Sequence, residues 1–223
     1  MIKGAERDPT IQQNQKLKMI TVYTANTPNG VKIPIVLEEL EVPYAIHRID
    51  LSANEQKQAA FLAINPNGRI PAIVDLDGPE GRSLSVFESG AILLYLADKF
   101  KRLIPEDPVG RVRALEYLFF QMGGVGPMFG QAGWFMRQDE KVPMAIARYQ
   151  TESRRLTDVL EARLSAQPWL AGDDYSIADI ANFGWLRVAS YAGIDLANYP
   201  SVQRWVQVIE ARPAVQRALA TMA

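Results

Sequence analysis

The first hundred residues alternate between short apolar runs and amphipathic stretches. Apolar runs at 20–24 and 44–51, bounded by turn-forming residues, predict two strands. The stretches 31–40 and 55–64 carry apolar residues at helical spacing and predict two helices. Pro34 is compatible with the first helix because it falls in the first turn, where its missing N–H would have no partner anyway.

A hairpin pattern follows. Apolar segments at 71–76 and 83–87 predict two strands, and the loop 77–81 between them is longer than the two-residue hairpin type. The segment 89–100 has helical spacing of apolar residues. The predicted order is therefore β-α-β-α-β-β-α, which is typical of a small mixed sheet covered by helices.

No strand pattern recurs in the second half of the chain. Residues 101–108, rich in proline and charge, form a predicted linker. Helical periodicity then covers 111–121, 144–164, 177–190, 202–212 and 214–220. Ser176 and Asp179 have the spacing of a capping box at a helix start. We predict an α/β domain over 20–100, an all-helical domain over 109–223, and a mobile or surface-draped extension over 1–19.

Residues 118–136 carry no formal charge and are long enough to span a membrane. Their five glycines, one proline and two glutamines instead favour a buried, kinked helix, in which the glycines allow close approach of helices or a ligand. The first 19 residues contain no apolar stretch that could be a signal peptide. We therefore expect a cytoplasmic protein with no membrane partner.

Composition removes several kinds of chemistry. The 223 residues carry a net charge of −1, so no basic excess indicates a nucleic-acid partner. The chain contains no cysteine and one histidine, which excludes cysteine nucleophiles, disulfide scaffolds, zinc fingers and iron–sulfur clusters, and we expect no metal. His47, in a predicted strand, is expected to have no catalytic role. Any thiol chemistry must use a thiol that arrives with a ligand.

Four local motifs, in this order and spacing, carry a resemblance. They are Asn65-Pro-Asn-Gly-Arg-Ile-Pro71, Phe87-Glu-Ser-Gly-Ala-Ile92, Asp173-Asp-Tyr-Ser-Ile-Ala-Asp179 and Tyr199-Pro-Ser-Val-Gln-Arg-Trp205. With them, the chain from about 19 to 220 resembles the cytosolic glutathione transferase family. Residues 27–30 and 121–127 are similar to the bacterial nu class, which includes glutathione-dependent disulfide-bond reductases. The resemblance implies a thioredoxin-like N-terminal domain.

Ile70, Pro71, Glu88 and Ser89 are the main candidates for binding glutathione. The family has a cis peptide before the proline, which would let Ile70 pair with the cysteinyl backbone of glutathione. Glu88 can pair with an amine, and Ser89 and a helix N-terminus can bind a carboxylate, so together they suit the γ-glutamyl end. The alternatives are a proline that merely starts a strand and a plain helix cap.

Thr27 and Asn29 are the catalytic candidates, because the nu-class resemblance assigns stabilisation of the glutathione thiolate to these positions. A hydroxyl or amide hydrogen bond near a helix N-terminus favours a thiolate. The alternative is that both are ordinary turn residues. Tyr23 competes for the role, although its apolar strand favours a core position, and Thr24 and Asn26 are weaker candidates.

Further candidates come from the same resemblance. Gln56 and Arg69 match positions that contact the glycine end or backbone of glutathione, and Arg148 is expected to reach a second glutathione or the partner subunit. Each has a solvated surface role as its alternative. The predicted apolar pocket for the second substrate is walled by Met128, Phe129, Trp134 and Phe135, although such residues also suit a core.

The sequence thus predicts a glutathione-dependent enzyme that acts on a small electrophilic or disulfide substrate. Disulfide-bond reduction or thioether cleavage ranks above conjugation, and without a cysteine any reduction must run through bound glutathione molecules. The resemblance also implies a homodimer and a place in detoxification. The alternative is a non-catalytic, transferase-like binding or scaffold protein.

Overall fold

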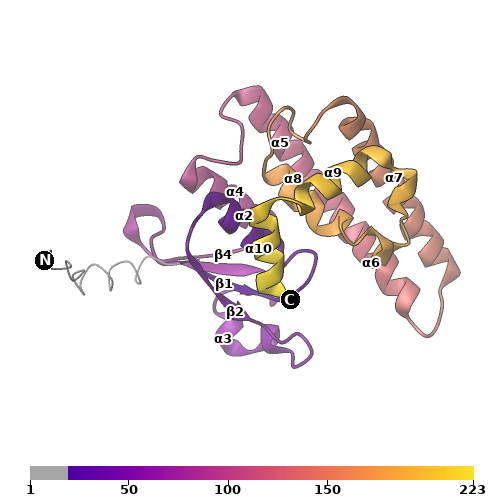
Figure 1. The fold of residues 1–223 in the computed structure, drawn as a ribbon. Coiled ribbons are helices and arrows are strands. Elements are labelled where there is room, and N and C mark those ends of the chain that lie inside the picture. Colours follow the sequence, from indigo (N-terminus) through magenta and orange to yellow (C-terminus); the bar gives the residue numbers. More distant parts are fainter. Residues whose placement is uncertain (1–19) are drawn as a thin grey trace, which may run out of the picture.

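The computed structural model describes residues 20–223, and the predicted extension over 1–19 lies outside them. Its N-terminal half is built around a four-stranded sheet of order β2-β1-β3-β4 (Figure 1). The strands and helices of this half are β1 (Ile20–Thr24), α2 (Lys32–Leu40), β2 (Tyr44–Arg48), α3 (Ala59–Leu62), β3 (Ala72–Asp75), β4 (Leu84–Phe87) and α4 (Ser89–Phe100). β1 and β2 are parallel, whereas β3 is antiparallel to both β1 and β4. The predicted mixed sheet and thioredoxin-like order are confirmed.

The segment predicted as a single helix over 55–64 is broken. It consists of a 3-10 turn, Glu55–Lys57, followed by the four-residue helix α3, because the backbone of Gln58 between them is extended. β2 also ends earlier than predicted, at Arg48. Shortly after it, the Asp50 carboxylate accepts hydrogen bonds from the amides of Ser52 and Ala53, which turns the chain.

The second half is helical. Its main elements are α5 (Pro108–Phe120), a π-helical turn (Gln121–Val125), α6 (Gly126–Arg137), α7 (Pro143–Ala166), α8 (Ile177–Leu186), α9 (Pro200–Glu210) and α10 (Pro213–Met222). Short 3-10 turns occupy Ala189–Ala192 and Leu196–Asn198 in this half, and another, Pro79–Gly81, lies between β3 and β4 of the N-terminal half. α8 is buried along its whole length, and the predicted capping box of Ser176 and Asp179 is present at its start.

The uncharged window 118–136 is the end of α5, the π-helical turn and most of α6. Gly124 faces Leu156, and Gly126 faces Gln121 and Trp185, at distances that leave little or no room for a side chain. Around Gly123, in contrast, an added Cβ would meet no atom of the described residues within 4 Å, apart from the backbone of its own helix and its chain neighbours. Within residues 20–223, no helix combines the length and apolar character needed to cross a membrane.

The two halves share one hydrophobic core. It contains Leu37 of α2, Phe183 of α8 and Val215 of α10. The last helix, α10, returns to the N-terminal half and packs against α2, as Figure 1 shows. There the Arg212 guanidinium, which lies just before α10, forms an ion pair with Glu39 of α2.

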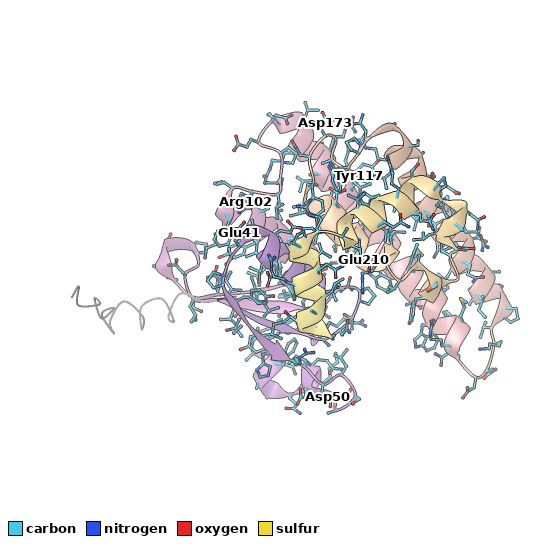
Figure 2. The ribbon with its side chains drawn as sticks, in the orientation of Figure 1. Glu41, Asp50, Arg102, Tyr117, Asp173 and Glu210 are labelled. Carbon is cyan, nitrogen blue, oxygen red and sulfur yellow. The ribbon has the colours of Figure 1, made fainter. Side chains whose placement is uncertain are left out.

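The linker after α4 also holds the N-terminal half. Arg102 donates hydrogen bonds to the carbonyls of Glu39 and Leu40 at the end of α2. Figure 2 shows Arg102 beside Glu41, the residue at which this helix ends. Free carbonyls at a helix C-terminus are favourable partners for a cation. The contact fixes the C-terminal end of α2 and, with it, the orientation of this helix, which begins after the β1–α2 loop.

A smaller apolar cluster lies where α3 packs on the sheet, and it contains Phe61 and Ile49. Tyr23 of β1 packs against it, with its ring centroid 6.3 Å from that of Phe61 and 5.0 Å from that of His47. The tyrosine therefore lies against α3. His47 is exposed on β2.

Candidate functional site

The loop between β1 and α2 is held by two threonine hydroxyls. Buried Thr24 donates its hydroxyl to the carbonyl of Gly30, and the Thr27 oxygen accepts from the amide of Gly30, both at 3.0 Å. A Cβ at Gly30 would lie 2.0 Å from the carbonyl oxygen of Ala25, so only glycine fits the fold of this loop. The Thr24 hydroxyl is thus used within the loop. The Thr27 hydroxyl hydrogen is left for a ligand, because that oxygen acts as an acceptor towards Gly30.

The orientation of the Asn29 side chain is fixed. Its Oδ1 accepts hydrogen bonds from Lys32 Nζ at 2.8 Å and from Trp185 Nε1 at 2.9 Å. Both partners are donors, so the oxygen must face them and the NH2 group must face away. Asn29 lines the cavities described below. It therefore presents an N–H donor beside Thr27, whereas neighbouring Asn26 is exposed.

Lys32, which the sequence analysis did not single out, is wholly buried beneath this loop. Besides Asn29, its Nζ contacts Ser89 Oγ at 3.3 Å and Gln121 Oε1 at 2.6 Å. Burial lowers the pKa of the Lys32 amine well below its usual value, and the charge of Glu88 opposes that shift. The amine thus joins the β1–α2 loop to the start of α4 and to the helical domain.

The start of α4 is built to receive an anion. Glu88 precedes the helix with φ 69°, a backbone conformation that residues other than glycine adopt at a cost of about 1–3 kcal/mol. The Glu88 side chain makes no cap hydrogen bond to the first-turn amides of α4. Those amides are therefore available to a carboxylate, and so is the Ser89 hydroxyl once it turns from the Met122 sulfur, a weak acceptor at 3.7 Å. The Glu88 carboxylate beside them can pair with an amine.

The opposite wall comes from the segment before β3. The Ile70–Pro71 peptide bond is cis, as the resemblance implied. Ile70, Arg69 and Gln56 line the same cavity as Thr27. The Gln56 Oε1 atom is buried and, among the described residues, has no hydrogen-bond partner. An unsatisfied buried acceptor at a cavity wall fits a ligand that brings its own N–H or O–H group.

Two adjoining cavities form one cleft along these residues. The smaller cavity, about 480 Å³, is lined by Thr27, Gln56 and Ile70. The larger, about 780 Å³, holds Glu88 and Ser89 and extends to the helical domain. Asn29, Arg69 and Trp185 line both cavities. The cleft therefore runs between the two halves, with the Asn29 amide at the point where the cavities meet.

The aromatic wall of the larger cavity differs from the predicted one. Trp134 lines it, together with Trp185 and Tyr191. The assignment of Phe129 to the pocket is wrong, because its side chain has 0% exposure and belongs to the core. Met128 and Phe135 do not line either cavity, and Phe135 stacks on Tyr149 with ring centroids 5.5 Å apart.

Arg148 and Lys57 differ in whether they line the cleft. Arg148 is exposed on α7 and lines neither of the two cavities. Lys57, absent from the sequence candidates, lines the smaller cavity and adds a second cation beside Arg69. Within residues 20–223, no group of three or more acidic or histidine side chains could hold a metal ion.

Known proteins match this chain over nearly its whole length. Residues 18–98 match the glutathione S-transferase N-terminal domain, and residues 127–213 match the C-terminal domain. Disulfide-bond oxidoreductase YfcG of Escherichia coli is 47% identical over 203 residues, which cover 90% of this chain and 94% of that protein. The chain therefore belongs to the glutathione S-transferase family.

Solved structures agree. A family member from Pseudomonas fluorescens with two glutathione bound superposes with a TM-score of 0.87 at 41% identity, covering 94% of this chain and 96% of that one. A glutathione transferase from Pseudomonas putida with one glutathione disulfide bound per subunit also has a TM-score of 0.87 and 41% identity, over 91% of both chains. The resemblance stated from the four motifs is confirmed.

Proposed function

We propose that this protein is a glutathione-dependent disulfide-bond reductase that uses the thiolate of bound glutathione as its nucleophile. One observation carries the proposal. In a chain without cysteine, the Thr27 hydroxyl and the fixed Asn29 amide offer two hydrogen-bond donors inside a cleft whose ends suit the two ends of glutathione.

The cleft accommodates glutathione in one direction. The γ-glutamyl carboxylate binds Ser89 and the first amides of α4, and its ammonium pairs with Glu88. The cysteinyl backbone lies along Ile70. The glycine end reaches Gln56, whose buried oxygen accepts an N–H, and its carboxylate meets Arg69 and Lys57. This direction places the sulfur between the two cavities, beside Thr27 and Asn29.

Two donors at the sulfur are enough to activate it. A free thiol has a pKa of about 8.5, so only a few per cent is ionised at neutral pH. Lowering that pKa by about 2 units takes roughly 2.7 kcal/mol. Hydrogen bonds to a charged acceptor contribute about 1.5–3 kcal/mol each, so Thr27 and Asn29 can supply the shift.

The reaction proceeds by two thiol–disulfide exchanges. The bound thiolate attacks one sulfur of the substrate disulfide, forms a mixed disulfide with glutathione, and releases the other sulfur as a thiolate that takes a proton from solvent. A second glutathione thiolate then attacks the glutathione sulfur of the mixed disulfide. This step gives glutathione disulfide and frees the second substrate thiol, so two glutathiones are oxidised as one disulfide is reduced.

The larger cavity holds the second partner. Its volume of about 780 Å³ and its wall of Trp134, Trp185 and Tyr191 suit a second glutathione or a flat organic substrate. The relatives with two glutathiones or with glutathione disulfide support this use. Because reduced glutathione is the reductant, we place the reaction in the cytoplasm.

A homodimer is part of the proposal. Val109, Val112 and Phe119 have exposed fractions of 70%, 55% and 65% and lie at helical spacing along one face of α5. An exposed apolar stripe of this kind suits a subunit contact, and Arg148 is then available to the partner's cleft. Sedimentation should give a dimer. A species of 24.9 kDa would contradict it.

Two measurements test the activity. Calorimetry should show heat for glutathione and for glutathione disulfide, and the rate with 2-hydroxyethyl disulfide should exceed that with an aryl halide. A faster aryl halide reaction would assign conjugation instead of reduction. If neither form of glutathione gave heat, the proposed activity would be wrong and the alternative, a non-catalytic binding or scaffold protein, would be favoured.

A further inference from the structure

The charged residue Lys32 contacts two parts of the proposed glutathione site, the β1–α2 loop and the start of α4. It lies at the start of α2 and is fully buried, which is rare for a lysine. Its Nζ reaches an acceptor in the β1–α2 loop (Asn29), one at the start of α4 (Ser89) and one in the π-helical turn (Gln121). Three acceptors match the three hydrogens of an ammonium group.

These contacts set which hydrogens face the cleft. With Lys32 donating to Asn29 Oδ1, the amide NH2 is directed towards the cavities. With Lys32 donating to Ser89 Oγ, the hydroxyl hydrogen is directed to the Met122 sulfur at 3.7 Å, a weak acceptor that a ligand carboxylate can replace. A neutral amine would instead accept that hydrogen, and Ser89 would have none to offer a carboxylate. The charged state of Lys32 therefore keeps Ser89 a donor, while the Lys32 N–H, together with that of Trp185, holds the Asn29 amide with its NH2 group towards the cavities.

The surroundings favour that state when an anion is bound. Burial alone lowers the pKa of the Lys32 amine, and Glu88 is the acidic group whose charge acts against the shift. A thiolate and a carboxylate held nearby would add to the effect of Glu88. The ammonium would in turn stabilise both anions, because Lys32 itself is buried and its charge is poorly screened by water.

The helical domain takes part through its π-helical turn. The wider turn at Gln121–Val125 places the buried Gln121 side chain at 2.6 Å from Lys32 Nζ. π-helical turns inside α-helices are frequent at functional sites. Trp185 of α8 holds Asn29 Oδ1 from the same domain. The N-terminal donors are thus oriented by contacts that exist only when both domains are in place.

We propose that Lys32 is a positioning residue for the reaction: as an ammonium ion it orients Asn29 towards the sulfur of bound glutathione and Ser89 towards its γ-glutamyl carboxylate. The inference rests on the proposed function. It assigns a role to a residue that touches neither the substrate nor the reacting atoms.

The test compares Lys32→Met with the wild type, and uses Lys141→Met as a control, because Lys141 is an exposed lysine whose amine donates to the carbonyls of Met136 and Gln138 at the end of α6, outside the two cavities. The thiol pKa of bound glutathione is read from thiolate absorbance against pH, beside kcat and KM for 2-hydroxyethyl disulfide. Lys32→Met should raise that pKa by about one unit and lower kcat at neutral pH by about tenfold, with a smaller change in KM.

The outcomes separate the two proposals. If wild-type protein binds no glutathione, the proposed function is wrong and the role of Lys32 falls with it. If the wild type is active but Lys32→Met keeps its thiol pKa and kcat, only the role of Lys32 is wrong. A lower melting temperature with an unchanged thiol pKa would mean that Lys32 is merely structural. If Lys32→Met fails to fold, Lys32→Gln is judged by the same two quantities.

Discussion

Trp185 of α8 donates its indole N–H to Asn29 Oδ1 at 2.9 Å, across the boundary between the two domains. The helical domain thereby does more than cover the cleft, because it fixes the donor that faces the proposed sulfur position. Trp185→Phe should keep the ring and lose this bond. A neutral hydrogen bond of about 1 kcal/mol corresponds to a roughly fivefold loss of kcat with little change in KM.

The matched control for this change is Trp169→Phe, in the loop before α8, where the indole packs on Tyr175 away from the cleft. Steady-state kinetics with 2-hydroxyethyl disulfide compare the two variants. Equal rates for both would mean that the orientation of Asn29 does not depend on Trp185.

Glu88 is expected to lower the stability of the fold through its backbone strain while its charge supports glutathione binding. Its φ of 69° costs about 1 kcal/mol or more, and glycine adopts such a conformation without that strain. Glu88→Gly should therefore raise the melting temperature by about 2–4 °C while weakening the affinity for glutathione. Glu88→Gln, which keeps the strain and removes the charge, should weaken binding without raising the melting temperature. Calorimetry measures the affinity of each variant for glutathione, and thermal unfolding measures its melting temperature. A lower melting temperature for the glycine variant would contradict this account of the backbone.

Gly184 allows α8 to approach the β1–α2 loop. A Cβ there would lie 2.3 Å from the carbonyl oxygen of Pro28 and 3.1 Å from Lys32 Cε. Gly184→Ala should thus destabilise the protein by about 1–3 kcal/mol and lower its activity. Gly123→Ala, whose Cβ would meet no atom within 4 Å, should leave stability unchanged or slightly improved. Similar melting temperatures for the two variants would show that the α8–loop contact is not tight.

Asp179 gives a pH dependence of stability with a defined sign. Burial raises the pKa of its carboxyl from 3.8 to about 6, although Trp205, Leu170 and Ser176 donate hydrogen bonds to it. A raised pKa means that the folded state holds the proton more tightly. Proton binding by Asp179 therefore stabilises the folded state fully below about pH 4, and this stabilisation is lost as the pH rises through about 6.

Asp179→Asn removes this titration. The stability of the wild type relative to the variant should increase, by a few kcal/mol at most, as the pH falls from about 7 to about 4. Chemical denaturation of both proteins across that range measures the difference. A difference that does not vary with pH would mean that the carboxyl keeps its ordinary pKa.

Local patterns predicted most of the fold. The capping box of Ser176 and Asp179 and the start of α4 at Ser89 depend on residues near one another in sequence, and both are found in the structure. The break within 55–64 was missed because it depends on the extended backbone of Gln58, which no periodicity reveals. The sequence does not distinguish Phe129 from a pocket residue, because core and cavity residues are equally apolar and only the packing shows that Phe129 is buried.

The contacts that organise the site were the part that sequence reasoning could not reach. Lys32, Gln121 and Trp185 are far apart in the chain and meet only through the packing of α2, α8 and the π-helical turn. A lysine in an amphipathic helix is expected to be solvated, so its burial gave no local signal. Asn29 was chosen by resemblance, whereas the direction of its amide follows only from the two donors that hold its oxygen.

A crystal structure of the protein with glutathione tests the central claim most directly, since the claim concerns where a sulfur atom lies. We predict the cysteinyl sulfur within hydrogen-bonding distance of Thr27 Oγ1 and Asn29 Nδ2, with the γ-glutamyl end at Glu88 and Ser89. A sulfur that points away from both donors, or a cleft that stays empty at saturating glutathione, would contradict the account.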